Sequence, residues 1–191
     1  MLVGLPGSGK SYLARLLAEP LDADLVQTDA LRKAMFREPR YTPREHAAVY
    51  GEAHRRLARQ LRLGRIVIFD ATNLEEKNRK VVYKIADEAG AALVIVRTYA
   101  PPEAISQRLA GRLRGVDPLD RSDADWSVYR RLGRASPISP PHLVVNTTVP
   151  LRQAVELVVA RASGVGRVRG KVLHDAPAAG LPVRLDEGFE R

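Results

Sequence analysis

The chain has 191 residues, and the 45% that are hydrophobic suffice for a sizeable core, which excludes wholesale disorder. It contains no cysteine, which excludes disulfides and thiolate metal sites, and no apolar run approaches the length of a membrane span. The formal net charge of +9 has two equally good explanations. It can indicate an anionic partner, or it can reflect an ordinary surface that is rich in arginine.

Short apolar runs alternate with longer amphipathic segments along the chain. Strands are expected at residues 1–3, 25–27, 65–69, 92–97 and 142–145. Helices are expected at residues 9–19, 29–37, 44–63, 75–89, 102–113, 122–133 and 151–162, with Asp29 as the N-cap of the second. Because the strands are apolar on both faces, this pattern predicts an α/β fold: a central parallel sheet of about five strands with helices on both faces, a three-layer sandwich.

The alternation ends near residue 163, so we expect one domain over residues 1–163. Residues 164–191 are rich in Gly, Pro and Arg and show little periodicity. We interpret them as a C-terminal tail or extension that is flexible or poorly packed.

Residues 4–11 read GLPGSGKS and match the phosphate-loop pattern G-x-x-x-x-G-K-[ST] in full. The segment follows an apolar strand and opens an amphipathic helix, which is the context that this pattern requires. Glycines let the backbone curve around phosphates with its N–H groups pointing inward, and the helix N-terminus adds a positive dipole. We therefore expect ATP with Mg²⁺, with Lys10 at the β- and γ-phosphates and Ser11 on the metal. The expected nucleotide-binding residues are Gly4, Pro6, Gly7, Ser8, Gly9, Lys10 and Ser11.

Asp29 and Arg32 follow the second expected strand, at the sheet edge that carries the phosphate loop. Their spacing places both on one face of a helix start. Transfer of a phosphoryl group to an alcohol needs a base for the hydroxyl proton and a cation on the acceptor side. Taken alone, the pair is better explained as a helix cap and a solvated arginine. With the phosphate loop upstream, the roles of proton acceptor and acceptor-side cation become the favoured interpretation.

Asp70 ends the buried strand at residues 65–69, where a carboxylate can hold Mg²⁺ through water. Thr72 and Asn73 follow it and are expected to face the cleft as hydrogen-bond donors to substrate. The alternative is that Thr72 or Asn73 caps the helix at residues 75–89, and both roles are compatible.

Arg108 and Arg112 lie four residues apart near the end of the helix at residues 102–113, so they share a face. A lid at about residues 107–121 can bring arginines to the charge that develops during phosphoryl transfer. The alternative is a solvated basic end that complements the helix dipole. His46 and His54 lack metal-like partners in the sequence, and we assign them no role.

The segments GLPGSGKS, TDALR, FDATN and QRLAGR resemble a branch of the P-loop kinases. This branch contains polynucleotide 5′-hydroxyl kinases, with zeta-toxin-like and gluconate-kinase-like enzymes as relatives. The similarity extends from residue 1 to about residue 163 and is greatest to the phage-type polynucleotide kinase domain. It implies a nucleoside-kinase-like P-loop NTPase fold with a helical lid.

The resemblance implies that Asp29 is the general base and that Arg32 binds the acceptor phosphate. It also implies that Arg108 and Arg112 are lid arginines near the donor phosphates. The sequence departs from the family pattern in its very short first strand. It also has one residue more than the Asp-Thr-Asn-Leu of the family, at residues 70–74.

The favoured prediction is an ATP-dependent kinase whose acceptor is the 5′-hydroxyl of DNA or RNA. The first alternative is a small-molecule kinase acting on a sugar, nucleotide sugar or antibiotic. The second is a regulatory ATP-binding module that couples hydrolysis to a partner. No signal peptide is visible, so a cytoplasmic location without membrane partners is expected.

Overall fold

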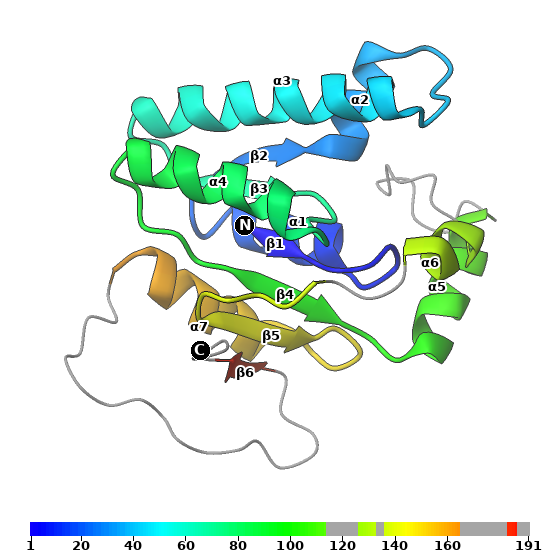
Figure 1. Ribbon diagram of the computed structural model, residues 1–191. Helices are drawn as coiled ribbons and strands as arrows, with labels where there is room; N and C mark the ends of the chain where they lie inside the picture. Colours follow the sequence, from blue (N-terminus) through cyan, green and yellow to red (C-terminus); the bar gives the residue numbers. More distant parts are fainter. Residues whose placement is uncertain (114–125, 133–135, 165–182, 187–191) are drawn as a thin grey trace.

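A computed structural model describes residues 1–113, 126–132, 136–164 and 183–186, and in it a central sheet lies between helices (Figure 1). The strands are β1 (Leu2–Val3), β2 (Asp24–Gln27), β3 (Val67–Asp70), β4 (Val96–Tyr99), β5 (His142–Asn146) and β6 (Val183–Asp186). The helices are α1 (Lys10–Ala18), α2 (Thr28–Met35), α3 (Pro43–Arg62), α4 (Glu76–Glu88), α5 (Pro102–Leu113), α6 (Trp126–Leu132) and α7 (Arg152–Ala162).

The sheet is mostly parallel, as the sequence predicts. β2 pairs with β3, and β4 pairs with β1 on one side and β5 on the other, all in parallel. The two groups of strands meet beside β1, where the Gly4 N–H donates to the Thr72 carbonyl at 3.0 Å. β6 runs antiparallel to β5. The sequence did not predict β6, which lies in the segment expected to be a poorly packed tail.

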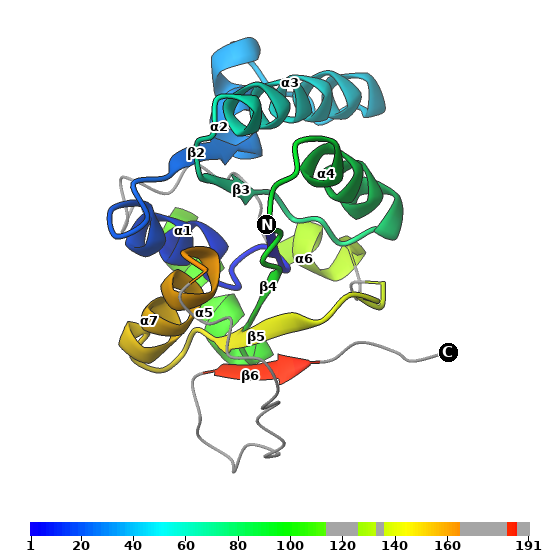
Figure 2. The same ribbon diagram turned by 90° about the vertical axis from the view of Figure 1, so that its left-hand side faces the viewer.

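Helices cover both faces of the sheet, with α3 and α4 on one face and α1 and α7 on the other (Figure 2). Successive strand residues therefore enter different cores, because side chains alternate along a strand. Val3 and Phe69 pack with residues of α3 and α4. Leu2 and Ile68, each one position earlier, pack with residues of α1 and α7. This double burial explains why the strands are apolar on both faces.

Several element boundaries differ from those expected. α2 begins at Thr28 with Gln27 as its N-cap, so Asp29 lies in the first turn and the prediction that it caps the helix was wrong. α3 begins after Thr42, whose hydroxyl accepts from the Glu45 N–H at 3.2 Å. β4 begins at Val96, four residues later than predicted, because an apolar run does not reveal which of its residues form the ladder.

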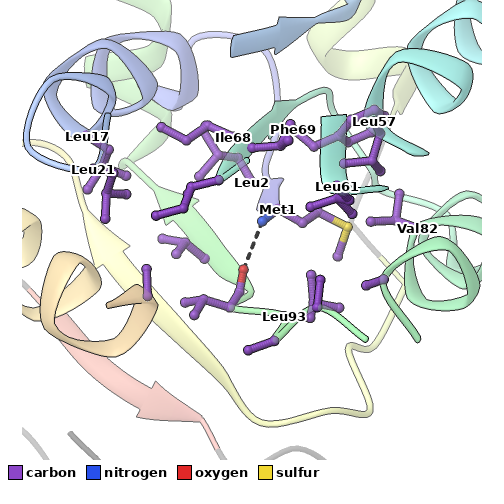
Figure 3. Close-up of a pocket in the computed structure, with 18 of the residues that line it drawn as sticks. Met1, Leu2, Leu17, Leu21, Leu57, Leu61, Ile68, Phe69, Val82 and Leu93 are labelled. Atoms are coloured by element: carbon purple, nitrogen blue, oxygen red, sulfur yellow. Dashed lines mark hydrogen bonds between the residues drawn. The ribbon is translucent and has the colours of Figure 1, made fainter. Parts of the chain in front are cut away.

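An apolar cavity of about 220 Å³ lies at the amino ends of the strands, between the two cores (Figure 3). Leu17 and Leu21 line it from one side, and Leu57 and Val82 line it from the other. Within it, the amino group of Met1 donates to the Val94 carbonyl at 2.8 Å. The polar motifs lie at the opposite, carboxyl ends of the strands, where parallel sheets bind ligands.

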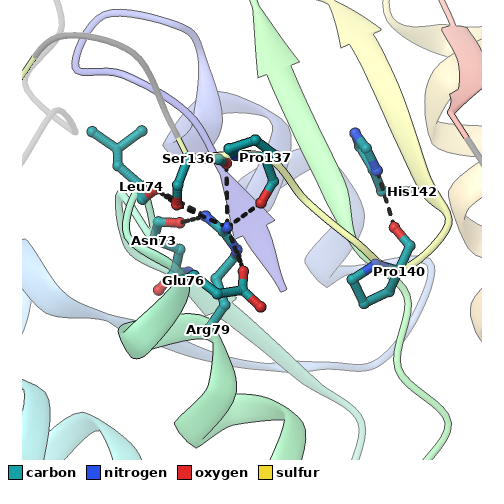
Figure 4. Close-up of polar contacts among 8 residues, drawn as sticks. All are labelled: Asn73, Leu74, Glu76, Arg79, Ser136, Pro137, Pro140 and His142. Carbon is teal, nitrogen blue, oxygen red and sulfur yellow. Dashed lines mark hydrogen bonds and ion pairs between the residues drawn. The ribbon is translucent and has the colours of Figure 1, made fainter. Parts of the chain in front are cut away.

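Arg79 on α4 is fully buried, and its guanidinium joins three segments of the chain (Figure 4). Nη1 donates to the carbonyls of residues 73 and 74, both at 2.9 Å. Nη2 donates to the carbonyl of Pro137 at 2.6 Å, and Nε donates to Glu76 at 3.0 Å. The arginine thus attaches the segment before β5 to the loop that follows β3.

We expect Arg79→Met to lower the free energy of unfolding by about 3–5 kcal/mol, because it leaves several buried carbonyls and Glu76 without their partner. Denaturant unfolding measures this change. The exposed neighbour Lys80 provides the matched control, since Lys80→Met should stay within about 0.5 kcal/mol of the parent. Equal stability of the two variants would contradict a structural role for Arg79.

Candidate active site

The phosphate loop has the curvature that its glycines predict. Gly7 has φ 76° and Gly9 has φ 87°, both in the left-handed region that favours glycine. Gly9 is the N-cap of α1 and, having no side chain, does not cap the N–H groups of this helix start itself. The first-turn N–H groups therefore point toward the concave side of the loop, where a phosphate binds.

Gly4 is the tightest position in the loop. A Cβ atom at this residue would lie 2.4 Å from the Thr98 hydroxyl and 2.6 Å from the Ser8 hydroxyl, which themselves form a hydrogen bond of 2.7 Å. Lys10 is buried, and its ammonium donates to the Leu5 carbonyl at 3.0 Å. The ammonium is therefore folded back across the loop, on the side where phosphates would bind, and the residues present fit a nucleotide.

Arg108 contacts the phosphate loop directly, from α5. Its Nη1 donates to the Gly7 carbonyl at 3.2 Å and to the Thr147 hydroxyl at 2.8 Å. Thr147 in turn donates to the Ser8 carbonyl at 2.9 Å. Burial lowers the pKa of Arg108 from its ordinary value. The sequence predicted Arg108 near the donor phosphates, and in the structure Arg108 contacts the backbone of the phosphate loop. Its role toward a nucleotide stays a prediction. Thr147 supports the loop, a role that the sequence did not predict.

The remainder of the predicted lid is only partly described. Arg112 lies on α5, but its side chain is outside the described part of the chain. Residues 114–121 also lie outside the described residues. The lid role of Arg112 therefore stays a prediction.

Asp70 and Thr72 lie at the carboxyl end of β3, beside the loop. Asp70 is 5% exposed and accepts from the Gln27 amide at 3.1 Å. The Thr72 hydroxyl lies 3.4 Å from that of Tyr50. Mg²⁺ in nucleotide sites takes one or two protein ligands together with phosphate oxygens. Among the residues that the structure describes, no group of three or more acidic or histidine side chains could hold a metal ion. Ser11 and Asp70 therefore remain the predicted Mg²⁺ ligands.

Asn73 lies elsewhere than the sequence suggested. It is fully buried, has φ 49°, and its side-chain amide donates to the Leu2 carbonyl at 2.7 Å. The amide therefore holds β1 against the loop that follows β3, and does not face the cleft as a donor to substrate. A local sequence pattern could not reveal this, because the partner is 71 residues away.

Asp29 and Arg32 both lie on α2, and Arg32 is 5% exposed. The guanidinium lies 4.6 Å from the centre of the Tyr41 ring and 3.8 Å from a carboxylate oxygen of Glu45. Nε and Nη1 of Arg32 have no hydrogen-bond partner among the described residues. A buried donor without a partner costs about 1–3 kcal/mol, so these two nitrogens are available to a hydrogen-bond acceptor.

Tyr50 on α3 links these residues to the loop after β3. Burial raises the pKa of the Tyr50 hydroxyl, and the carboxylate of Asp29 raises it further. The carboxylate therefore lies close enough to act electrostatically on this hydroxyl. His46, one turn earlier, stacks on the Tyr50 ring with the two centroids 4.3 Å apart. Together with Arg32, these residues form the group that we propose as the acceptor half of the site.

We expect Gly4→Ala to weaken ATP binding at least about 10-fold, because the new methyl group would overlap two hydroxyls that hold the loop. Equilibrium binding of a fluorescent ATP analogue measures this. Gly51 on α3 is the matched control, since a Cβ there meets only an arginine side chain at 3.7 Å. Gly51→Ala should therefore retain affinity, and loss of affinity in both variants would refute the explanation.

Burial lowers the pKa of His46 below its ordinary value of 6.5, and the charge of Arg32 lowers it further. Glu75 acts in the opposite direction. We therefore expect Arg32→Gln to raise the pKa of His46 and Glu75→Gln to lower it. NMR titration of the histidine rings measures both changes. A shift of the same sign in the two variants would contradict the placement of His46 between these charges.

Comparison with known proteins bears on both the family and the fold. Residues 1–134 match the AAA domain family. The chain is 30% identical over 154 residues to an uncharacterized protein of Mycobacterium tuberculosis, a match that covers 70% of this chain. It spans only 31% of the length of that relative.

Three solved structures share the fold. A candidate kinase from Chloroflexus aurantiacus superposes with a TM-score of 0.66 at 22% identity, covering 85% of this chain and 96% of that one. The Mycobacterium tuberculosis APS kinase CysC, in complex with AMPPNP and APS, gives 0.63 at 18% identity, covering 83% and 92%. A gluconokinase from Sinorhizobium meliloti gives 0.56 at 20% identity, covering 86% and 93%.

In the described part of the chain, no helix is long and apolar enough to cross a membrane. The mostly parallel sheet, the phosphate loop at its carboxyl edge and these neighbours agree on a P-loop kinase-like fold. The family match covers more than two thirds of the sequence. The chain therefore belongs to the AAA domain family.

Proposed function

We propose that this protein is an ATP-dependent kinase that transfers the γ-phosphoryl group to a hydroxyl of a small, negatively charged acceptor. The observation that carries the proposal is Arg32, a buried cation with two donor atoms unpartnered, on the same helix as Asp29. A phosphate, sulfate or carboxylate on the acceptor would satisfy those donors. The proposed kinase domain is residues 1–163.

The two halves of the site divide the work of the reaction. Lys10 and the loop backbone would hold the donor phosphates, with Mg²⁺ at Ser11 and Asp70 neutralising their charge. Arg32 would hold the anionic group of the acceptor and so orient its hydroxyl. The hydroxyl oxygen forms a bond to the γ-phosphorus as the bond to the β-phosphate oxygen breaks, releasing ADP. Asp29 accepts the hydroxyl proton.

Two observations favour a small acceptor over the polynucleotide that the sequence favoured. The guanidinium of Arg32 lies beneath the Tyr41 ring and beside Glu45, so its surroundings are confined. The basic residues on α3 that could line a channel for a polyanion are partly neutralised, because Arg55 and Arg56 both pair with Glu52 at 2.9 and 2.8 Å. The APS kinase and gluconokinase that share the fold also act, by their names, on small molecules.

A regulatory ATP-binding module is the rival from another class. It requires the phosphate loop but has no need of a proton acceptor on the same helix as a buried arginine whose Nε and Nη1 lack a hydrogen-bond partner among the described residues. The presence of Asp29 and Arg32 on one helix therefore supports transfer to an acceptor.

We expect Asp29→Asn to lower the rate of phosphoryl transfer at least about 10²-fold and to leave ATP affinity unchanged, because it removes the proton acceptor alone. Transfer from γ-labelled ATP and binding of an ATP analogue measure the two quantities. The exposed Asp87 on α4 provides a control, since Asp87→Asn should change neither. Undiminished transfer by Asp29→Asn would exclude this residue as the base.

The acceptor class is tested with a panel of hydroxyl compounds offered with γ-labelled ATP: phosphorylated sugars, nucleoside monophosphates, neutral sugars, aminoglycosides and 5′-hydroxyl oligonucleotides. Anionic small molecules should be labelled, and Arg32→Gln should raise their KM roughly 10- to 100-fold, the scale of a lost charge-assisted contact. Labelling of oligonucleotides alone, with a KM that rises steeply with salt, would restore the polynucleotide acceptor.

A further inference from the structure

His46 is a histidine to which the sequence assigned no role, and the structure places it in the acceptor half. It lies in the first turns of α3, and its ring is stacked on Tyr50 at 4.3 Å with an interplanar angle of 29°. Tyr50 is only 7% exposed, and its hydroxyl lies 3.4 Å from that of Thr72. The support beneath His46 is therefore rigid, while His46 itself is exposed.

The charged groups that act on His46 come from α2 and from the start of α4. Arg32 of α2 lowers its pKa, as does Lys77 of α4, whereas Glu75 at the start of α4 raises it. The imidazole stacks on Tyr50, and Glu45, which precedes His46 in the chain, lies 3.8 Å from Arg32. Partial burial is the largest cause of the lowered pKa of His46, and this disfavours a further positive charge near Arg32.

A second ring, that of Tyr41, lies against Arg32. Tyr41 covers the guanidinium at 4.6 Å and is 47% exposed. The backbone N–H of Tyr41 donates to Glu45 at 2.7 Å, and Glu45 also approaches Arg32 at 3.8 Å. One exposed ring thus lies over the buried cation, and the other belongs to the residue that follows Glu45, which approaches the same cation. Flat rings of this kind bind the faces of sugars, nucleobases and other ring compounds.

We infer that His46 is a specificity-determining residue of the acceptor half, and that the acceptor carries a ring next to its anionic group. The anion binds Arg32 and the ring lies against the imidazole of His46. This inference rests on the proposed function and narrows its acceptor from small anions in general to ring-bearing ones. An open-chain acceptor would bind the donors of Arg32 but would leave the face of the His46 ring exposed to water.

The test compares phosphate compounds that differ in whether they carry a ring. The protein, with labelled histidines, is saturated with a non-hydrolysable ATP analogue and titrated with glucose 6-phosphate, AMP, glycerol 3-phosphate and inorganic phosphate. We expect at least one ring compound to shift the His46 resonance and to bind about 3- to 10-fold more tightly than glycerol 3-phosphate, the usual scale of a ring contact. The resonance of His142, which is buried on β5, should not move.

His46→Ala should abolish the preference for ring compounds, and His46→Phe should retain it, because a phenyl ring also stacks. KM for a ring acceptor should rise in His46→Ala while kcat and KM for ATP stay unchanged. A preference that persists in His46→Ala, or the same affinity for glycerol 3-phosphate as for both ring compounds, would overturn the inference.

The outcomes also separate this inference from the proposed function. Transfer from γ-labelled ATP without any ring preference would overturn the role of His46 alone. Ring-dependent binding at His46 without transfer to any acceptor would support that role as a binding residue and overturn the proposed kinase reaction.

Discussion

The seam between β1 and the loop after β3 is the contact on which the rest of this structure depends. β1 has two residues, too few to hold two groups of strands together through its own ladder. Two hydrogen bonds join them instead, from the Gly4 N–H to the Thr72 carbonyl and from the Asn73 amide to the Leu2 carbonyl. The same bonds fix the first residue of the phosphate loop relative to Asp70. The donor side and the acceptor side of the site are therefore aligned by the contact that closes the sheet.

Two arginines, one buried and one half-buried, bind backbone carbonyls close to this seam. Arg79 binds the carbonyls of residues 73 and 74 and connects them to the segment before β5. Arg108 binds the Gly7 carbonyl within the phosphate loop and the Thr147 carbonyl at 2.6 Å, just beyond β5. A guanidinium suits both places because it offers five donors in a fixed plane and stays charged when buried. The basic composition of the chain thus serves its interior as well as its surface.

Arg32 differs from these two arginines in what surrounds it. Its neighbours are a ring face and a carboxylate at 3.8 Å, and two of its nitrogens lack a hydrogen-bond partner among the described residues. The carboxylate of Glu45 is already engaged by the N–H groups of Arg40 and Tyr41. Arg79 and Arg108 donate mainly to backbone carbonyls and so join parts of the protein to one another. Arg32 retains donors without such partners, and its proposed role in binding the acceptor rests on this difference.

The sequence by itself determined the fold class and the phosphate loop, because both rest on local patterns. The loop is contiguous, and strands buried on both faces have a recognisable composition. The sequence also placed Asp29 and Asp70 at the carboxyl ends of β2 and β3, with Arg32 three residues after Asp29 on the helix, since parallel strands share a carboxyl edge. Only the tertiary structure decided that Asn73 holds β1, that Arg108 and Thr147 support the loop, and that His46 lies over Tyr50 in the acceptor half. Some of those roles depend on partners that are far away in the chain, and others depend on which side of a helix faces its neighbours. Short sequence motifs indicate neither.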